Sequence, residues 1–242
     1  MNQMRSFDIL SYEDPRQREE WRSICRTFKE IDIFFYPEYV YLFELKGDGK
    51  AHCFVYYDGD NGIVIYPFLK RQINELPYFH DIPSDFIDIT SPYGYGGYLR
   101  NNEQIDMNNF FKIFHEFCLQ NRIVSEFIRF HPLLNNFAYS PDNVEVTESN
   151  EIVGIDLTMS SDAIWTNMNP SCRNKVRKAQ KHNIKIIKDD NFDKLDYFCE
   201  LYLNTMKRLK AHNYYYFSNQ WFNSLIHNIP KNVALFHAYY SG

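Results

Sequence analysis

The stretch Ser91-Pro-Tyr-Gly-Tyr-Gly-Gly-Tyr-Leu99 follows a short apolar segment, residues 86–90, that reads as a buried strand. Glycines at the end of a strand let the backbone turn sharply and bring N–H groups close to a ligand. On either side of this stretch, hydrophobic periodicity and turn residues predict further elements: strands at 7–10, 51–57, 62–70 and 125–130, and helices at 14–28, 39–45 and 104–120. This order describes one complete α/β unit.

The same order of elements begins again near residue 184. The second pass is predicted to contain a strand at 184–187, helices at 192–210 and 219–228, and a strand at 233–240. Because internal repetition determines architecture, we expect an α/β (α+β) fold: a mixed sheet flanked by helices in a first domain, residues 1–158, and the start of a second copy, residues 184–242. A strand at 152–157 and a basic linker helix, residues 159–183, would join them; Pro170 could break this helix.

The second copy would stop on the first arm of a hairpin, at Gly242, and leave an unpaired strand edge. We therefore expect this sequence to be a piece of a longer protein. Any active site built from both copies would then be incomplete in this chain.

The composition indicates a globular protein of the reducing cytoplasm. Apolar residues make up 45% of the chain and charged residues 24%, which suffices for a sizeable core. The net charge of −5 argues against general adhesion to nucleic acid, although a local basic patch is compatible with it. Five widely spaced cysteines without a CxxC pair predict free thiols and no metal site. No window is long and apolar enough to span a membrane, so any membrane contact would be peripheral, at the inner face.

Residues at the strand ends of the first copy are candidates for substrate contact. Arg129 and His131 lie two apart on one predicted strand, so we expect them to share a face and meet a phosphate or carboxylate. Lys70 and Arg71 end another strand and could belong to the same anionic pocket. The opening stretch adds residues that could touch a ligand or simply form a tight turn: Tyr93, Gly94, Tyr95, Gly96 and Gly97. The alternatives are a structural arginine, a buried histidine bonded to backbone, and solvated cations.

Positive charge is concentrated in the linker. Five cations lie within nine residues with no acidic residue among them: Arg173, Lys175, Arg177, Lys178 and Lys181. On an acidic chain this pattern predicts an anionic partner, namely a nucleotide-sugar pyrophosphate, a lipid phosphate head group or tRNA. A solvated helix face is the alternative.

Four stretches, taken in order, resemble the FemAB-like transferases, whose tandem GNAT domains build peptidoglycan interpeptide bridges: Tyr66-Pro-Phe-Leu-Lys70-Arg71, Asp88-Ile-Thr-Ser-Pro-Tyr-Gly-Tyr-Gly-Gly97, Arg129-Phe-His-Pro-Leu133 and Arg173-Asn-Lys-Val-Arg-Lys-Ala-Gln-Lys181. The resemblance implies a GNAT-like fold and transfer of an aminoacyl or acyl group onto an amine of a cell-wall or surface-glycan precursor. It also implies that the first domain holds the precursor and that the donor site lies largely in the second. The amine of such an enzyme attacks an ester or thioester directly and no covalent intermediate is needed, so the sequence identifies no catalytic residue.

Other functions stay open at this level. In GNAT proteins that bind acetyl-CoA, the strand–helix junction has a pattern close to Gln/Arg-x-x-Gly-x-Gly/Ala, and its leading Gln or Arg is missing here. The donor could be an aminoacyl-tRNA, or an acyl-CoA used by an N-acyltransferase of polysaccharide biosynthesis. The third possibility is a non-catalytic module that binds a phosphorylated sugar.

Overall fold

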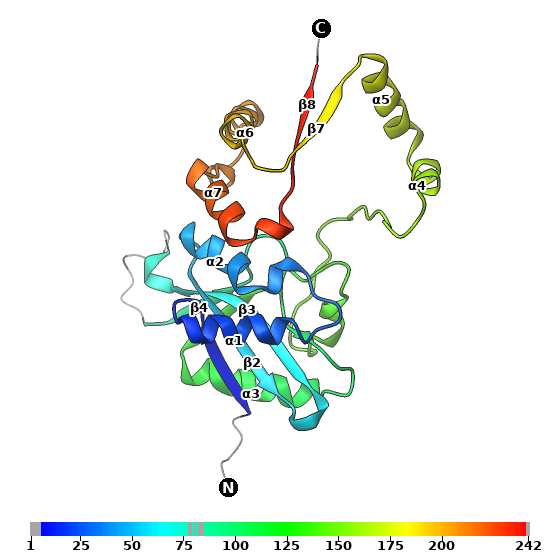
Figure 1. Cartoon of the computed structure of the whole chain (residues 1–242). Coiled ribbons are helices and arrows are strands. Elements are labelled where there is room, and N and C mark those ends of the chain that lie inside the picture. The colour runs from blue at the N-terminus through cyan, green and yellow to red at the C-terminus, as the bar shows by residue number, and fades with distance from the viewer. Residues whose placement is uncertain (1–5, 77–78, 80, 82–84, 241–242) are drawn as a thin grey trace. The chain divides into compact units, whose positions relative to one another are not determined.

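The computed structural model describes residues 6–76, 79, 81 and 85–240, and its first half is built on a six-stranded mixed sheet (Figure 1). The strand order is β1-β2-β3-β4-β6, with β5 paired to β3. Among the described strands of this sheet, only β4 and β6 pair in parallel. The strands have the following bounds: β1 (Phe7–Ser11), β2 (Lys50–Tyr57), β3 (Ile63–Gln72), β4 (Ile87–Thr90), β5 (Leu99–Arg100) and β6 (Ile123–Phe127).

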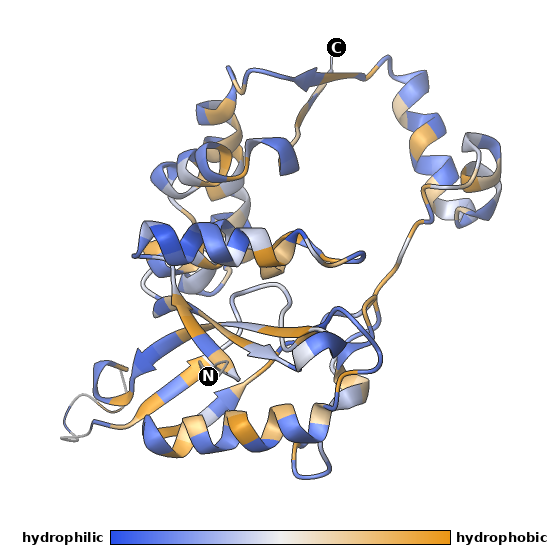
Figure 2. Cartoon of the chain, turned by 60° about the horizontal axis from the view of Figure 1, so that its bottom comes forward, coloured by the Kyte–Doolittle hydropathy of each residue, from blue (hydrophilic) through white to orange (hydrophobic). Residues whose placement is uncertain are grey.

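Helices cover both faces of this sheet: α1 (Pro15–Cys25), α2 (Pro37–Leu45) and α3 (Met107–Gln120). Their starts follow from the sequence, because Asp14 and Asp106 accept hydrogen bonds from the first free N–H groups of α1 and α3. Successive side chains of β2 alternate between the two faces. Phe54 and Tyr56 face α3, whereas α1 and α2 cover the other face, so the apolar strands lie between two helical layers (Figure 2).

The core on the α3 side is an aromatic cluster centred on Phe54. Its ring is fully buried and stacks on Phe7 with 5.0 Å between centroids. Three phenylalanines of α3 pack on it in edge or tilted orientation at 5.1–6.0 Å: Phe110, Phe114 and Phe117. The four-residue and three-residue spacings of these phenylalanines place them on one side of the helix.

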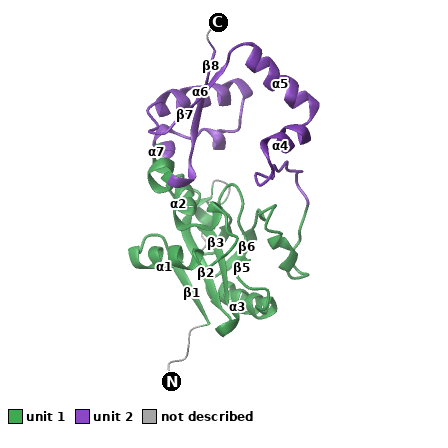
Figure 3. Ribbon diagram, turned by 45° about the vertical axis from the view of Figure 1, so that its right-hand side comes forward, with its two compact units in different colours: residues 1–147, 223–230 green, residues 148–222, 231–242 purple. Residues whose placement is uncertain are grey.

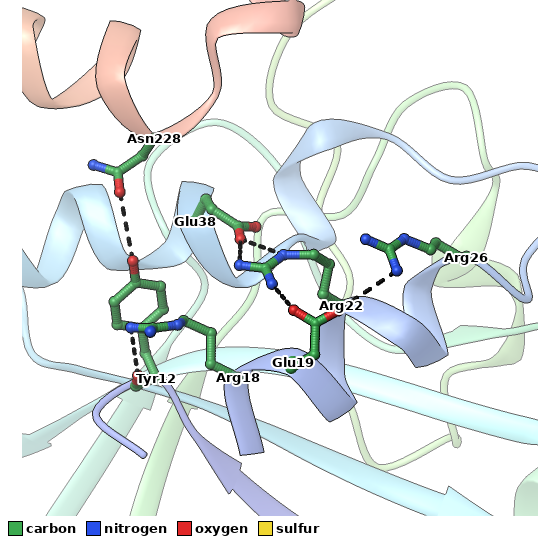
Figure 4. Close-up of polar contacts among 7 residues, drawn as sticks. All are labelled: Tyr12, Arg18, Glu19, Arg22, Arg26, Glu38 and Asn228. Atoms are coloured by element: carbon green, nitrogen blue, oxygen red, sulfur yellow. Dashed lines mark hydrogen bonds and ion pairs between the residues drawn. The ribbon is translucent and has the colours of Figure 1, made fainter. Parts of the chain in front are cut away.

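A charge network joins α1 to α2 (Figure 4). Glu38, in the first turn of α2, is buried, and its Oε1 accepts a hydrogen bond from Arg22 Nε at 2.7 Å. Arg22 also pairs with Glu19 on its own helix. A carboxylate at a helix N-terminus is favoured by the helix dipole. Glu38 therefore stabilises α2 in addition to forming the ion pair with Arg22 of α1.

Two units divide the chain (Figure 3): residues 1–147 with 223–230, and residues 148–222 with 231–242. The second unit contains a two-stranded sheet of β7 (Lys185–Asp189) and β8 (Leu235–Tyr239). The helices after residue 148 are α4 (Ser161–Asn167), α5 (Pro170–Lys181), α6 (Leu195–Leu209) and α7 (Asn219–Asn228), and the part of α7 from Asn223 onward is assigned to the first unit. Short 3₁₀ turns complete the described structure: η1 (Ile33–Phe35), η2 (Gly59–Asn61), η3 (Ile73–Glu75), η4 (Asn136–Tyr139), η5 (Asn213–Tyr215) and η6 (Pro230–Asn232).

The predicted repeat is present in the order of elements and in the pairing of the strands. In the sequence, α1 and α2 lie between the antiparallel strands β1 and β2. In the same way, α6 and α7 lie between the antiparallel strands β7 and β8. When Phe54-Val-Tyr-Tyr57 is aligned with His237-Ala-Tyr-Tyr240, the two ladders coincide, since Phe54 pairs with Ile9 and His237 with Ile187. The expected α+β, GNAT-like fold with a repeated opening is therefore confirmed. The predicted turn at Ser241 and Gly242 lies outside the described residues.

Two local predictions were wrong, and the break in the linker helix that the sequence allows near Pro170 is present. Residues 152–157 form no strand, although they are described and mostly apolar. The linker consists of two helices, because Pro170 lacks an N–H group and disfavours helical geometry at the residue before it; Asn169 instead caps α5. Finally, β6 ends at Phe127, and Phe130 makes only an isolated bridge to Gly96.

Replacing Phe54 by Ala removes the ring on which the α3 phenylalanines pack. We expect Phe54→Ala to lower the free energy of unfolding by about 3–5 kcal/mol, measured by urea denaturation. Leu119 on α3 is the control, because it is 66% exposed. Leu119→Ala should change stability by no more than about 0.5 kcal/mol. Equal losses in both variants would contradict this assignment of the core.

Candidate functional site

The segments that follow β4 and β6 are joined by backbone hydrogen bonds beyond the ends of these parallel strands. Ser91 N–H donates to the Phe127 carbonyl at 3.0 Å, and Arg129 N–H donates to Ser91 Oγ at 2.9 Å. Gly96 N–H donates to the Arg129 carbonyl at 2.7 Å. This arrangement brings the glycine–tyrosine stretch and Arg129 together.

Two glycines of the stretch are required by backbone geometry and close packing. Gly94 has φ +108°, and a Cβ there would lie 2.6 Å from Phe34 Cε1. Gly97 has φ +91°, and a Cβ there would lie 3.0 Å from Asn136 Nδ2. Left-handed backbone of this kind favours glycine.

The stretch does not have the geometry of a pyrophosphate-binding turn. Such a turn aims free N–H groups at the anion and leads into a helix N-terminus. Here Gly96 N–H is bonded to Arg129, and the chain continues into β5, which pairs with β3. The α3 helix begins only at Met107, with its N-terminus capped by Asp106.

Asn136 holds this region together and was not identified from the sequence. It is fully buried, and its Nδ2 donates to the carbonyls of Gly96 at 2.8 Å and Tyr98 at 3.1 Å. Its Oδ1 accepts from His131 N–H at 2.9 Å. No spacing rule marks an asparagine two of whose partners lie about 40 residues earlier in the chain.

His131 is buried, with its side chain only 4% exposed. Its Nδ1 accepts hydrogen bonds from the N–H groups of Leu133 and Leu134, both at 3.2 Å. Nε2 therefore carries the proton and donates to Asp32 Oδ2 at 3.1 Å, a tautomer assigned from these partners. Arg129 is exposed, so the two side chains do not share a solvent-facing surface, because the strand alternation ends at Phe127.

Aromatic rings from η1 and α2 surround the glycine–tyrosine stretch. Phe34 meets Tyr39 edge-on at 4.9 Å and Tyr95 at 5.3 Å. The Tyr39 hydroxyl donates to the Tyr93 carbonyl at 2.9 Å. Burial raises the pKa of Tyr39 well above its ordinary value, so this hydroxyl stays a donor. Phe34 and Tyr39 were not predicted as site residues.

The exposed part of the site consists of one guanidinium and the two aromatic rings that it contacts. We call these three residues the Arg129 patch: Tyr93, Phe127 and Arg129. The guanidinium carbon lies 5.0 Å from the Phe127 centroid and 5.7 Å from the Tyr93 centroid. Both rings are exposed, Tyr93 to 36% and Phe127 to 52%. A guanidinium held over rings keeps its planar N–H donors for a carboxylate or phosphate.

Lys70 and Arg71 lie nearer the start of β4. Arg71 is directly opposite Asp88 and forms a bidentate ion pair with it, at 2.5 Å from Nε and 2.7 Å from Nη2. Lys70 is opposite Ile89. Arg129, by contrast, is bonded to Ser91 beyond the end of this strand. The Arg71 guanidinium thus already has a carboxylate partner.

The two arginines of α5 contact α4. Arg173 Nη1 donates to the carbonyls of Thr166 at 2.7 Å and Trp165 at 3.4 Å, at the end of α4. The Arg177 guanidinium lies 5.4 Å from the Trp165 centroid. The three lysines of α5 are exposed: Lys175, Lys178 and Lys181.

Gly94 offers a test of the packing at this site. We expect Gly94→Ala to destabilise the protein by about 3 kcal/mol or more, because left-handed strain and overpacking add. Gly47 is the control: its φ is +91°, yet nothing lies within 4 Å of a Cβ there. Gly47→Ala should cost about 1–2 kcal/mol in the same denaturant titration. Similar losses would refute the close approach of Phe34.

Residues 136–240 match the model of the FemAB family. The matched range, somewhat less than half of the chain, includes α4, α5 and the second strand–helix–helix–strand unit. Three of the four resembling stretches, which lie before residue 134, fall outside it. No curated protein matches the chain.

Among the residues that the structure describes, none of the helices is long and apolar enough to cross a membrane. The matched range also contains the second strand–helix–helix–strand unit, which begins with β7 and ends with β8. Over residues 136–240 this chain is therefore similar to the FemAB family.

Proposed function

We propose that this chain is part of a transferase that moves an aminoacyl group onto an amine of a bacterial peptidoglycan or surface-glycan precursor in the cytoplasm. The observation that carries the proposal is that the FemAB match contains the second copy of the repeated opening. A family match alone would leave the first unit unexplained. The repeat relates that unit to the matched region and supports a tandem architecture.

The thiols of the first unit support a mechanism without a cysteine nucleophile. Burial raises the pKa of Cys25 and Cys53 well above the ordinary range, and it raises that of Cys118 to about 12. A protonated, buried thiol is a poor nucleophile. Direct attack by the acceptor amine needs positioning and oxyanion stabilisation instead.

The geometry after β4 favours precursor contact over CoA binding in the first unit. Gly96 N–H is already bonded and the stretch leads into a strand, so the amide cradle for a pyrophosphate is not formed there. The Arg129 patch offers a cation and two exposed rings, which suit an anionic group on a glycan precursor. An aminoacyl-tRNA donor is therefore our first choice and an acyl-CoA the alternative.

A transfer assay with the longest native form of the protein tests the donor. An amine-bearing, nucleotide-linked peptidoglycan precursor is incubated with aminoacyl-tRNA or with acyl-CoA, and the product is followed by mass spectrometry. We expect transfer from aminoacyl-tRNA that ribonuclease abolishes. Ribonuclease-resistant transfer from acyl-CoA would replace this proposal by the N-acyltransferase. Precursor binding without transfer from either donor would favour a non-catalytic binding module.

The role of the Arg129 patch is tested by precursor affinity. Arg129→Gln removes a charge-assisted contact, which is worth about 1.5–3 kcal/mol, so binding should weaken about tenfold or more. Isothermal titration calorimetry with the precursor measures this change. Arg16→Gln, at a side chain 94% exposed on α1, is the charge-matched control and should leave affinity unchanged. Unaltered binding by Arg129→Gln would remove the patch from the site.

A further inference from the structure

The buried imidazole of His131 holds a carboxylate that the proposed function does not use. Asp32 precedes η1, and its Oδ1 accepts a hydrogen bond from Ile33 N–H at 2.5 Å. Its Oδ2 accepts from His131 Nε2 at 3.1 Å, although His131 lies 99 residues later in the chain. The His131 side chain is 4% exposed and that of Asp32 is 43% exposed. A buried donor therefore fixes the orientation of a carboxylate that solvent still reaches.

This carboxylate keeps its negative charge. His131 Nδ1 accepts hydrogen bonds from the N–H groups of Leu133 and Leu134, so the imidazole carries a single proton, on Nε2, and is neutral. Within the described residues, no lysine or arginine forms an ion pair with Asp32.

The more deeply buried carboxylates of the first unit are compensated differently. Three of them are only 10–13% exposed and pair with a lysine or arginine of the same unit: Glu38 with Arg22, Glu44 with Lys50 and Asp88 with Arg71. The partner of Asp32 is a neutral imidazole instead. The positive charge that balances Asp32 therefore has to come from solvent or from a ligand.

Aromatic side chains surround the pair of Asp32 and the imidazole. The rings of Phe34 and Tyr95 lie 5.8 and 5.5 Å from the imidazole centroid, and they meet each other edge-on. Burial raises the pKa of Tyr39, and the charges of Tyr93 and Asp32 raise it further, which places Asp32 near this hydroxyl. A carboxylate beside aromatic rings suits a cationic nitrogen, because the rings attract positive charge and reduce the water that screens it.

We propose that Asp32 binds the primary ammonium group of a ligand and that His131 is its positioning residue. Each carboxylate oxygen of Asp32 accepts one hydrogen bond in the structure and has a second lone pair for an ammonium N–H. A metal ion is a poorer match, because such ions take several protein ligands. No group of three His, Cys, Asp or Glu side chains in the described part of the chain is placed to hold one. The proposal goes beyond the anion binding that we assign to Arg129.

Two kinds of ligand carry this group. One is a free small amine. The other is the acceptor amine of the precursor, and for this ligand the inference rests on the proposed function.

The first experiment uses n-butylammonium chloride as the probe and the full chain labelled with nitrogen-15, observed by NMR near neutral pH. We expect saturable shifts of the Ile33 amide and the His131 ring, with a Kd of about 1–10 mM for one charge-assisted contact and its aromatic neighbours. Asp32→Asn keeps the size of the side chain and removes its charge, so it should weaken binding at least tenfold. Asp60→Asn, on the exposed turn η2, is the charge-matched control and should bind like the parent.

Comparison of ligands on the parent protein does not depend on the folding of any variant. We expect no site-specific shifts with n-butanol, which has no charge, and weaker binding of tetramethylammonium, which donates no hydrogen bond. Equal shifts with butanol, or no saturable shift with butylammonium, would overturn the proposal. Tighter binding of tetramethylammonium would show that the rings recognise the cation and the carboxylate does not.

His131→Gln tests the positioning role. It should weaken butylammonium binding by less than Asp32→Asn does, because the charge remains but loses its fixed orientation. Unaltered affinity would make His131 a structural residue only. Unaltered affinity in Asp32→Asn would remove the carboxylate from the site.

Calorimetry with the precursor and with its N-acetylated form separates the two kinds of ligand. If Asp32 takes the acceptor amine, acetylation should weaken binding to the parent about tenfold and leave binding to Asp32→Asn unchanged. If acetylation has no effect although butylammonium binds, the ligand is a free amine.

The failure of this proposal differs from that of the proposed function. If butylammonium binds through Asp32 but neither donor supports transfer, the function is wrong and the ammonium site stands. If transfer proceeds and butylammonium shifts neither resonance, the site is wrong and the function stands.

Discussion

The hydrogen bond from Gly96 N–H to the Arg129 carbonyl is the contact on which the site of the first unit depends, because it closes two loops that leave parallel strands. Parallel strands have no connecting turn, so the segments beyond them need another tie. Asn136 completes the tie by bonding the Gly96 carbonyl and the His131 N–H. The position of the Arg129 guanidinium between two rings follows from this arrangement.

The extent to which sequence predicted structure differs between the fold and the site. Elements with clear periodicity, such as the helix α1 after Asp14 and the strands β2 and β3, were correctly predicted within a few residues. The strand β5 was missed because two residues carry no periodicity, and its pairing with Ile65 is a long-range contact. Asn136 was missed for the same reason.

The charge pattern of α5 did not predict which of its cations contact other parts of the protein. Five neighbouring cations form one group in the sequence, and a contact with the end of α4 separates them in the structure. The position at which α4 ends is set by Pro170, a local signal, but the reach of Arg173 to the Thr166 carbonyl depends on how the two helices meet. Such contacts are not encoded in any single window.

The two matching strand pairs, β1–β2 and β7–β8, carry different side chains at an equivalent position. At the position of Phe54, which anchors an aromatic core, the second copy has His237, whose Nε2 lies 3.3 Å from Asp189 Oδ2. Burial alone would raise the pKa of Asp189, but the N–H groups of Lys194 and Asp193 hold it below its ordinary value. A sheet of only two strands buries little apolar surface by itself and is marginally stable. Local opening should therefore cost less free energy around β7 and β8 than in the six-stranded sheet, so backbone amides should exchange with solvent in two distinct kinetic classes.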